Sequence, residues 1–167
     1  MNRLKCLVLD VDGVLTDSRI FFSDDGKEMK AFNSKDGHGL KLIMRAGIQV
    51  AIITGRYSKA LEYRVKDLGI EHVIQGSKDK TASLRELSKN LGIDPAEMAY
   101  MGDDVVDLPA MKLCAVSIAP ADAVEMVRRK ADIVTVLPGG HGAVREAVEI
   151  ILKRMNLFDA VMERYVV

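Results

Sequence analysis

The sequence predicts a doubly wound α/β fold, in which helices cover both faces of a parallel sheet. Short apolar runs that are typical of buried strands alternate along the chain with longer segments of helical periodicity. Polar residues, several of them acidic, directly follow these apolar runs. In such sheets ligands bind beyond the carboxyl ends of the strands, so the polar residues mark the expected binding edge.

The first predicted strand, at residues 7–9, runs into the segment Asp10-Val11-Asp12-Gly13. Alternate side chains of an extended chain point the same way, so Asp10 and Asp12 leave the strand tip together. Gly13 then lets the backbone turn away. Two carboxylates at the end of a buried strand need a compensating charge, which makes this segment the one around which the chain is organised.

A β-hairpin is predicted next, at residues 19–32. The strand-like runs 19–22 and 28–32 flank an Asp-Gly turn. A lone two-stranded ribbon is marginally stable in water, and this one carries the apolar side chains of Phe21 and Phe22. We therefore expect the hairpin to fold back on the core or to pack against another subunit.

The remaining elements alternate as the fold class requires. Further strands are predicted at residues 49–53, 72–74, 98–101, 115–118 and 133–135. Three helical patterns begin at Asp36, Ser58 and Asp79, and a fourth includes Ala123 and Val127. A final helical region follows the glycine-rich segment 139–142 and ends in an apolar stripe at 157–165. We expect Ser58 to cap its helix and Gly69 to end it. The apolar stripe predicts that the tail docks on the body of the protein.

Three predicted strands end in groups suited to phosphate chemistry. Asp10, Asp12, Thr54 and Asp103 meet at the carboxyl edge of the sheet in this arrangement. Oxygen ligands without organised His or Cys favour Mg²⁺, which would offset repulsion between Asp10 and a phosphate. Lys80 adds a positive charge and Thr54 a hydroxyl donor. Asp10 is then the nucleophile that forms an aspartyl-phosphate, and Asp12 the general acid and base. Taken alone, each feature is commonly a turn or a solvated residue; their joint occurrence at element ends indicates a site.

Composition narrows the remaining classes. The chain has 167 residues, 49% of them hydrophobic, and we expect residues 1–167 to form a single domain. Its 24 basic and 24 acidic residues leave no formal net charge, which disfavours a nucleic-acid partner. No apolar run reaches transmembrane length, there is no signal-peptide stretch, and Cys6 and Cys114 lack metal-ligand spacing. We expect a cytoplasmic protein with no membrane partner.

The segments 10–17, 54–56, Lys80 and 102–109 resemble the four motifs of the haloacid dehalogenase superfamily. That resemblance implies a Rossmann-like phosphatase domain with Mg²⁺ as its cofactor. It assigns the metal to the Asp10 carboxylate, the backbone carbonyl of Asp12 and the side chain of Asp103. Two further carboxylates would hold waters or ligands in place, those of Asp104 and Asp107. The substrate-binding residues that it suggests in these motifs are Thr54, Gly55, Arg56 and Lys80.

A finer resemblance extends over nearly the whole chain. The hairpin, the segment 36–39, Arg64 and the segment 139–146 are similar to the 3-deoxy-D-manno-octulosonate 8-phosphate phosphatases. Those are tetrameric sugar-acid phosphatases of bacterial lipopolysaccharide synthesis. Relatives that act on nine-carbon nonulosonate 9-phosphates usually carry Glu where Arg56 stands, which favours the eight-carbon substrate. The nine-carbon compound or another small phosphoester is the alternative.

No cap domain fits within the predicted elements, because residues 17–36 hold a hairpin and residues 54–80 a helix and a strand. Walls for a small sugar acid must then come from elsewhere, and we expect a homotetramer with active sites at subunit boundaries. Arg64 and Arg145 are candidates to bind the substrate's carboxylate, since Arg pairs bidentately with such groups. Ordinary surface ion pairs are an equally open interpretation for both.

Several points stay open at this level. A receiver-type signalling module is the alternative outside enzymes, although its phosphate-accepting Asp would stand at a middle strand that here ends in Thr54. We expect His38 and His141 to lie in glycine-rich loops near the site, and they have no metal-ligand spacing. Residues 33–35 have no assigned role. The sequence leaves open whether the tail closes its own site or that of a neighbour.

Overall fold

The computed structural model describes residues 4–166, and its centre is a six-stranded sheet in the order β5-β4-β1-β6-β7-β8. All neighbouring strands in this sheet pair in parallel. The strands are β1 (Cys6–Leu9), β4 (Gln49–Ile53), β5 (His72–Ile74), β6 (Met98–Met101), β7 (Val116–Ala119) and β8 (Ile133–Val134). The predicted fold class is confirmed, and β1 lies between β4 and β6.

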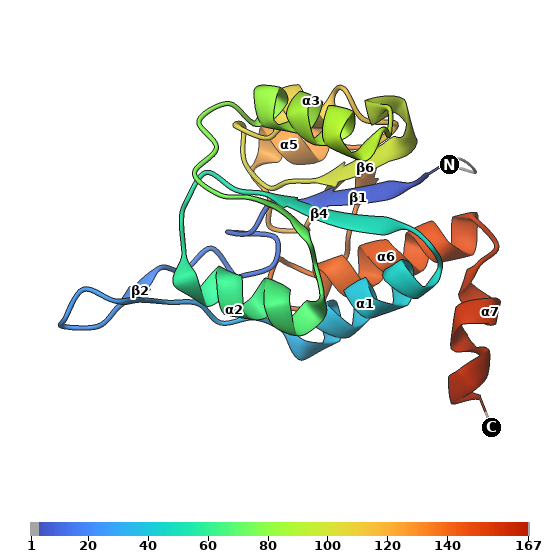
Figure 1. Ribbon diagram of the computed structural model, residues 1–167, viewed down its shortest axis with the longest axis horizontal. Helices are drawn as coiled ribbons and strands as arrows, with labels where there is room; N and C mark the ends of the chain where they lie inside the picture. The colour runs from blue at the N-terminus through green and yellow to red at the C-terminus, as the bar shows by residue number, and fades with distance from the viewer. Residues whose placement is uncertain (1–3, 167) are drawn as a thin grey trace.

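Helices cover both faces of this sheet (Figure 1). One face is covered by α1 (Ser34–Arg45), α2 (Lys59–Leu68) and α6 (Ala143–Arg154), and the other by α3 (Lys80–Leu91), α4 (Leu108–Met111) and α5 (Glu125–Lys130). The sequence pattern did not predict the four-residue α4, and it placed the start of α5 too early, near Ala123. A short 3₁₀ turn, η1 (Pro95–Glu97), precedes β6.

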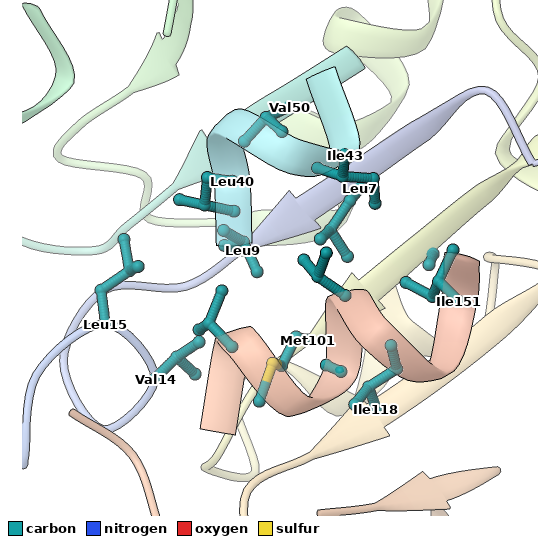
Figure 2. Packing of buried hydrophobic residues seen from close by; sticks show 14 of the residues in the cluster. Leu7, Leu9, Val14, Leu15, Leu40, Ile43, Val50, Met101, Ile118 and Ile151 are labelled. Atoms are coloured by element: carbon teal, nitrogen blue, oxygen red, sulfur yellow. The ribbon is translucent and has the colours of Figure 1, made fainter. Parts of the chain in front are cut away.

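Strand β1 feeds both halves of the core because its side chains alternate between the two faces. Leu7 and Leu9 pack toward α1 and α6, where Figure 2 shows them beside Leu40, Ile43 and Ile151. The intervening residues of β1 belong to the opposite cluster, beneath α3. These side chains are fully buried, and each large aliphatic one contributes about 1.5–3 kcal/mol to folding. The strand that carries the first acidic segment is thus anchored on both sides.

Helix α1 begins two residues earlier than the sequence suggested. Asn33 is its N-cap, and its side chain accepts a hydrogen bond of 2.8 Å from the backbone of Lys35. Residues 33–35, which had no assigned role, are therefore a helix start. His38 lies within this helix and not in a loop, and its ring is 5.6 Å from that of Tyr165.

Helix α2 ends at Gly69 in the left-handed conformation, as predicted. The prediction that Ser58 caps this helix through its side chain was wrong. Ser58 occupies the N-cap position, but its hydroxyl makes no capping hydrogen bond, and its backbone N–H donates to Gln75 at 2.8 Å. In α3 the N-cap works as expected, since Asp79 accepts hydrogen bonds from the backbone of the first turn.

The hairpin consists of β2 (Phe21–Phe22) and β3 (Glu28–Met29), which pair antiparallel. Its second strand is shorter than the predicted run 28–32, and the hairpin extends away from the body of the molecule (Figure 1). Phe22 is 63% exposed and Met29 56% exposed. Its apolar tip therefore does not fold back on the core, and only Phe32 at its base packs there.

The tail docks as predicted. Leu157, just before α7 (Phe158–Met162), and Val161 within it are partly buried against the core. The 3₁₀ turn η2 (Glu163–Tyr165) follows. In the part of the chain that the structure describes, none of the helices has the length and apolar character needed to span a bilayer.

Candidate active site

The carboxyl ends of β1, β4 and β6 bring the predicted residues to one edge of the sheet. Asp10 follows β1, Thr54 follows β4, and Asp103 comes two residues after β6. The backbone N–H of Asp10 donates to the carbonyl of Met101 at 3.0 Å, which carries the pairing of β1 and β6 past the strand end. Asp10 is 7% exposed and Thr54 3% exposed, so both side chains are held in fixed surroundings.

Three carboxylates form a cluster at this edge. Asp10, Asp103 and Asp107 each offer an oxygen, and these oxygens lie within 4.8 Å of one another. Such an all-oxygen donor set fits Mg²⁺ by its chemistry. Asp104 does not join the cluster: its side chain is exposed and accepts a 2.6 Å hydrogen bond from the backbone of Val105.

Lys80 links two members of this cluster. Its Nζ lies 2.7 Å from Oδ2 of Asp10 and 2.6 Å from Oδ1 of Asp107. Tyr100 donates a hydrogen bond of 3.0 Å to the same oxygen of Asp107, whose side chain is fully buried. The start of α3 thus places a cation beside Asp10, and a buried carboxylate fixes that cation from behind.

Asp107 also shapes the loop after β6. Its Oδ2 accepts hydrogen bonds from the backbone N–H groups of Asp103 and Asp104, at 3.2 and 3.3 Å. A side chain at Gly102 would collide with Asp107, so this loop can close only around a glycine. In this structure Asp107 has a more central place than the sequence indicated, because it holds both Lys80 and the loop that presents Asp103.

Burial sets the electrostatics of the cluster. It raises the pKa of Asp10 to about 6, helped by the nearby Asp107 carboxylate and opposed by Lys80. Burial likewise raises the pKa of Asp103 to about 7, with Asp10 as the next cause. For Lys80, burial alone would lower the pKa, but Asp10 and Asp107 raise it above its ordinary value. The lysine is therefore a permanent cation, and the carboxylates need further positive charge to ionise together.

Asp12 meets the hairpin and not the cluster. Its Oδ1 forms an ion pair with Lys30, and its Oδ2 lies 3.7 Å from Nε of Arg56. Arg56 in turn pairs with Glu28 through Nη2. Sequence reasoning missed Lys30 and Glu28. Residues two apart on an extended segment share a face, but nothing in the sequence shows what that face meets.

Gly13 allows the first acidic segment to approach Asp103. Its φ is +82°, and a Cβ at this position would collide with the Asp103 carboxylate. A Cβ on Gly139 would in turn collide with the carbonyl of Gly13, and Gly140 donates a 3.1 Å hydrogen bond to the carbonyl of Val14. The glycine-rich segment 139–142 therefore packs on the loop of its own chain.

The buried carboxylate of Asp36 connects this glycine-rich segment to α1. It accepts hydrogen bonds from the backbone N–H groups of Gly142, at 3.2 Å, and Arg145, at 2.8 Å. Asp36 thus caps the start of α6 from a neighbouring helix. His141 is exposed at the surface of the same segment.

Arg64 and Arg145 have partners away from the carboxylate cluster. Arg64 forms a 3.0 Å ion pair with Asp67 and donates a 3.2 Å hydrogen bond to the carbonyl of Asn33. Arg145 pairs with Glu149 at 2.7 Å. Their side chains are 21% and 23% exposed. Binding of a substrate carboxylate by either one stays a prediction.

Comparison with known proteins bears on this arrangement. Residues 36–114 match the model of the haloacid dehalogenase-like hydrolase family. The chain is 43% identical over 158 residues to the 3-deoxy-D-manno-octulosonate 8-phosphate phosphatase of Escherichia coli strain K12, covering 95% of this chain and 84% of that protein. The corresponding phosphatase of Yersinia pestis is 45% identical over 149 residues, with 89% and 80% covered. The chain belongs to this phosphatase family.

Solved structures of 3-deoxy-D-manno-octulosonate 8-phosphate phosphatases agree with the fold. The Moraxella catarrhalis enzyme, in complex with magnesium ion, phosphate ion and KDO, superposes with a TM-score of 0.95 at 43% identity, over 98% of this chain and 94% of that one. The cobalt-bound Haemophilus influenzae enzyme gives a TM-score of 0.92 at 40% identity, over 95% and 93%. Membership of a hydrolase family decides against the signalling module that the sequence had left as an alternative.

Proposed function

We propose that this protein is a magnesium-dependent phosphatase that converts 3-deoxy-D-manno-octulosonate 8-phosphate into the free sugar acid and phosphate, as a step of lipopolysaccharide precursor synthesis. The observation that carries the proposal is the contact of Asp10 with Lys80 at 2.7 Å beside an all-carboxylate cluster. It stands in a chain 43% identical to named phosphatases of this substrate. The reaction needs a nucleophile, a charge to offset phosphate, and an acid.

The residues present divide this work. A carboxylate oxygen of Asp10 attacks phosphorus, and the bond from phosphorus to the sugar oxygen breaks with its electron pair on that oxygen. Asp12 gives the leaving oxygen a proton. Asp12 then takes a proton from a water that attacks the aspartyl-phosphate, which releases phosphate and restores Asp10.

The surroundings of Asp10 favour attack by an anion on an anion. Lys80 fixes Oδ2 of Asp10 and keeps a positive charge beside the incoming phosphate. Thr54 provides a hydroxyl donor for the phosphate oxygens. Gly55 and Arg56, the other proposed substrate-binding residues of this segment, follow it on the same loop. Magnesium held by Asp10, Asp103 and the carbonyl of Asp12 would supply the further positive charge that the raised carboxylate pKa values call for.

We further propose that the active protein is a homotetramer whose hairpins meet neighbouring subunits. In the described residues, the connection from β1 to α1 holds only the hairpin, and the connection from β4 to α3 holds only α2 and β5. The site therefore lacks an inserted covering element, while Phe21, Phe22 and Met29 are left exposed on the hairpin. Exposed apolar patches of this kind mark interfaces.

We place the protein in the cytoplasm. Both cysteines are free thiols, and burial raises the pKa of Cys6 and of Cys114 to about 12. Such thiols are unreactive, and their pattern suits a reducing compartment.

The substrate is tested by comparing kcat/KM on the eight-carbon acid phosphate, a nine-carbon nonulosonate 9-phosphate and a neutral hexose 6-phosphate. We expect the eight-carbon compound to be preferred. Arg64→Ala should lower kcat/KM on it by about 10- to 100-fold, because a charge-assisted contact contributes roughly 1.5–3 kcal/mol. The same change should barely affect the hexose phosphate.

Arg85→Ala is the matched control, because Arg85 is exposed on α3 at the opposite face of the sheet. A wild-type preference for the hexose phosphate would refute the substrate. Equal losses on acid and hexose phosphates would instead refute only the assignment of Arg64.

A further inference from the structure

The side chain of Lys30 is buried, although much of the hairpin that carries it is exposed. Its side chain is 2% exposed, whereas the neighbouring Met29 is 56% exposed. Lysines are rarely buried, and a buried charge is costly unless it is paired. Lys30 is paired twice, with Oδ1 of Asp12 and with Oε1 of Glu28 at 3.3 Å. The hairpin therefore supplies a buried ion-pair partner to Asp12, the residue that we assign as the acid and base.

The two carboxylate oxygens of Asp12 have different surroundings. Oδ1 receives the Lys30 ammonium group. Oδ2 lies 3.7 Å from Nε of Arg56, which is too long for a hydrogen bond, and within the described residues it accepts none. One oxygen is thus anchored, and the other remains available to carry a proton.

Glu28 extends the contact to a second loop. It pairs with Lys30 and with Nη2 of Arg56, which lies on the loop after β4. Without Lys30, the remaining charged neighbour of Asp12 among the described residues would be Arg56, on the side of Oδ2. Loss of Lys30 would therefore remove the contact that fixes Oδ1.

We propose that Lys30 is a positioning residue, which anchors Oδ1 of Asp12 so that Oδ2 faces the leaving oxygen of the substrate. This inference rests on the proposed phosphatase function and adds the hairpin to the catalytic machinery of its own chain. In the step concerned, the bond from phosphorus to the sugar oxygen breaks, its electron pair goes to that oxygen, and the proton on Asp12 moves to it.

The choice of leaving group isolates this role. A sugar alkoxide must be protonated as it leaves, whereas p-nitrophenolate is stable as an anion and needs no proton. The kcat/KM value reports the steps up to release of the alcohol or phenol. A loss of general-acid positioning therefore lowers kcat/KM for the sugar phosphate and spares it for p-nitrophenyl phosphate, while a general loss of structure or of positive charge lowers both.

The test compares Lys30→Met with wild type on 3-deoxy-D-manno-octulosonate 8-phosphate and on p-nitrophenyl phosphate, with Mg²⁺ present. We expect a loss of about 10- to 100-fold on the sugar phosphate and less than about threefold on the aryl phosphate. Lys27→Met is the matched control, since Lys27 lies on the same hairpin, is 81% exposed and pairs with Asp25. It should behave as wild type on both substrates.

Lys30→Gln provides a second variant that retains a polar group in the buried position, and it carries the test if Lys30→Met does not fold by circular dichroism. Equal losses on the two substrates, no loss on either, or faster turnover without the lysine would each overturn the positioning role. A wild-type protein inactive on both compounds would refute the proposed function itself, and the inference with it.

Discussion

Replacing Lys80 by Met should destabilise the protein through charge and not through lost volume. The lysine Nζ lies 2.7 Å from Asp10 and 2.6 Å from Asp107, and the two carboxylate side chains are 9% and 0% exposed. Removing one partner of a buried ion pair typically costs about 3–5 kcal/mol, because the other charge stays buried without compensation. That is a large part of the roughly 5–15 kcal/mol by which a domain is stable.

Urea unfolding in chelator at neutral pH measures this loss. Lys89→Met is the control on the same helix, where Lys89 is exposed, and its free energy of unfolding should stay within about 0.5 kcal/mol of wild type. The double variant Asp10→Asn with Lys80→Met should recover part of the stability, since it removes one of the facing charges. The deficit of Lys80→Met should also shrink toward pH 4, as the carboxylates become protonated. Exposed surface ion pairs contribute at most about 1 kcal/mol. A free energy of unfolding for Lys80→Met that lies within about 1 kcal/mol of wild type would therefore refute this reasoning.

Three further results are expected. Asp10→Asn should abolish turnover while the protein still folds, because an amide cannot attack phosphorus; steady-state hydrolysis by a verified variant would exclude Asp10 as nucleophile. The pKa values of Asp10, about 6, and Asp103, about 7, are raised by burial, so the metal-free native state binds protons more tightly than the unfolded chain. Its stability should therefore fall as pH rises from about 4 to about 7, and thermal unfolding should show Mg²⁺ stabilising more at pH 7 than at pH 5; equal effects would contradict the cluster. Changing Phe21 and Phe22 to Ser should dissociate the proposed tetramer in sedimentation and reduce activity on the sugar phosphate more than on p-nitrophenyl phosphate; a wild-type monomer at working concentration would contradict the proposed assembly.

The fold was predictable because its signals are local. Apolar runs located the strands of the sheet to within one residue at most ends, since a strand buried on both faces must be apolar throughout. The acidic segment after β1 and the Gly102-Asp103 segment after β6 reached the same edge because parallel strands carry their carboxyl ends there. Helix starts were less certain: Asn33 caps α1 ahead of Asp36, and the Ser58 hydroxyl does not cap α2.

Partners between distant segments were not predictable in the same way. Tyr100 looked like an ordinary strand residue, yet its hydroxyl supports Asp107 at 3.0 Å. The buried pairing of Asp107 with Lys80 joins residues 27 positions apart and depends on how α3 sits on the sheet. Lys30 likewise meets Asp12, 18 positions earlier in the chain, through the placement of the hairpin beside the loop after β1. No periodicity encodes such contacts, since each depends on the relative placement of two elements.

The hairpin gives the uncovered site two different surfaces. Side chains alternate along an extended strand, so Glu28 and Lys30 point to one side and Met29 to the other. The first side meets Asp12 and Arg56, and it buries Lys30 almost completely. Phe21 pairs directly with Met29 on the outer side, which is exposed and which we propose as the subunit contact. Assembly would then hold in place the same ribbon that positions Asp12, so that the oligomer and the proton transfer to the leaving group depend on one element.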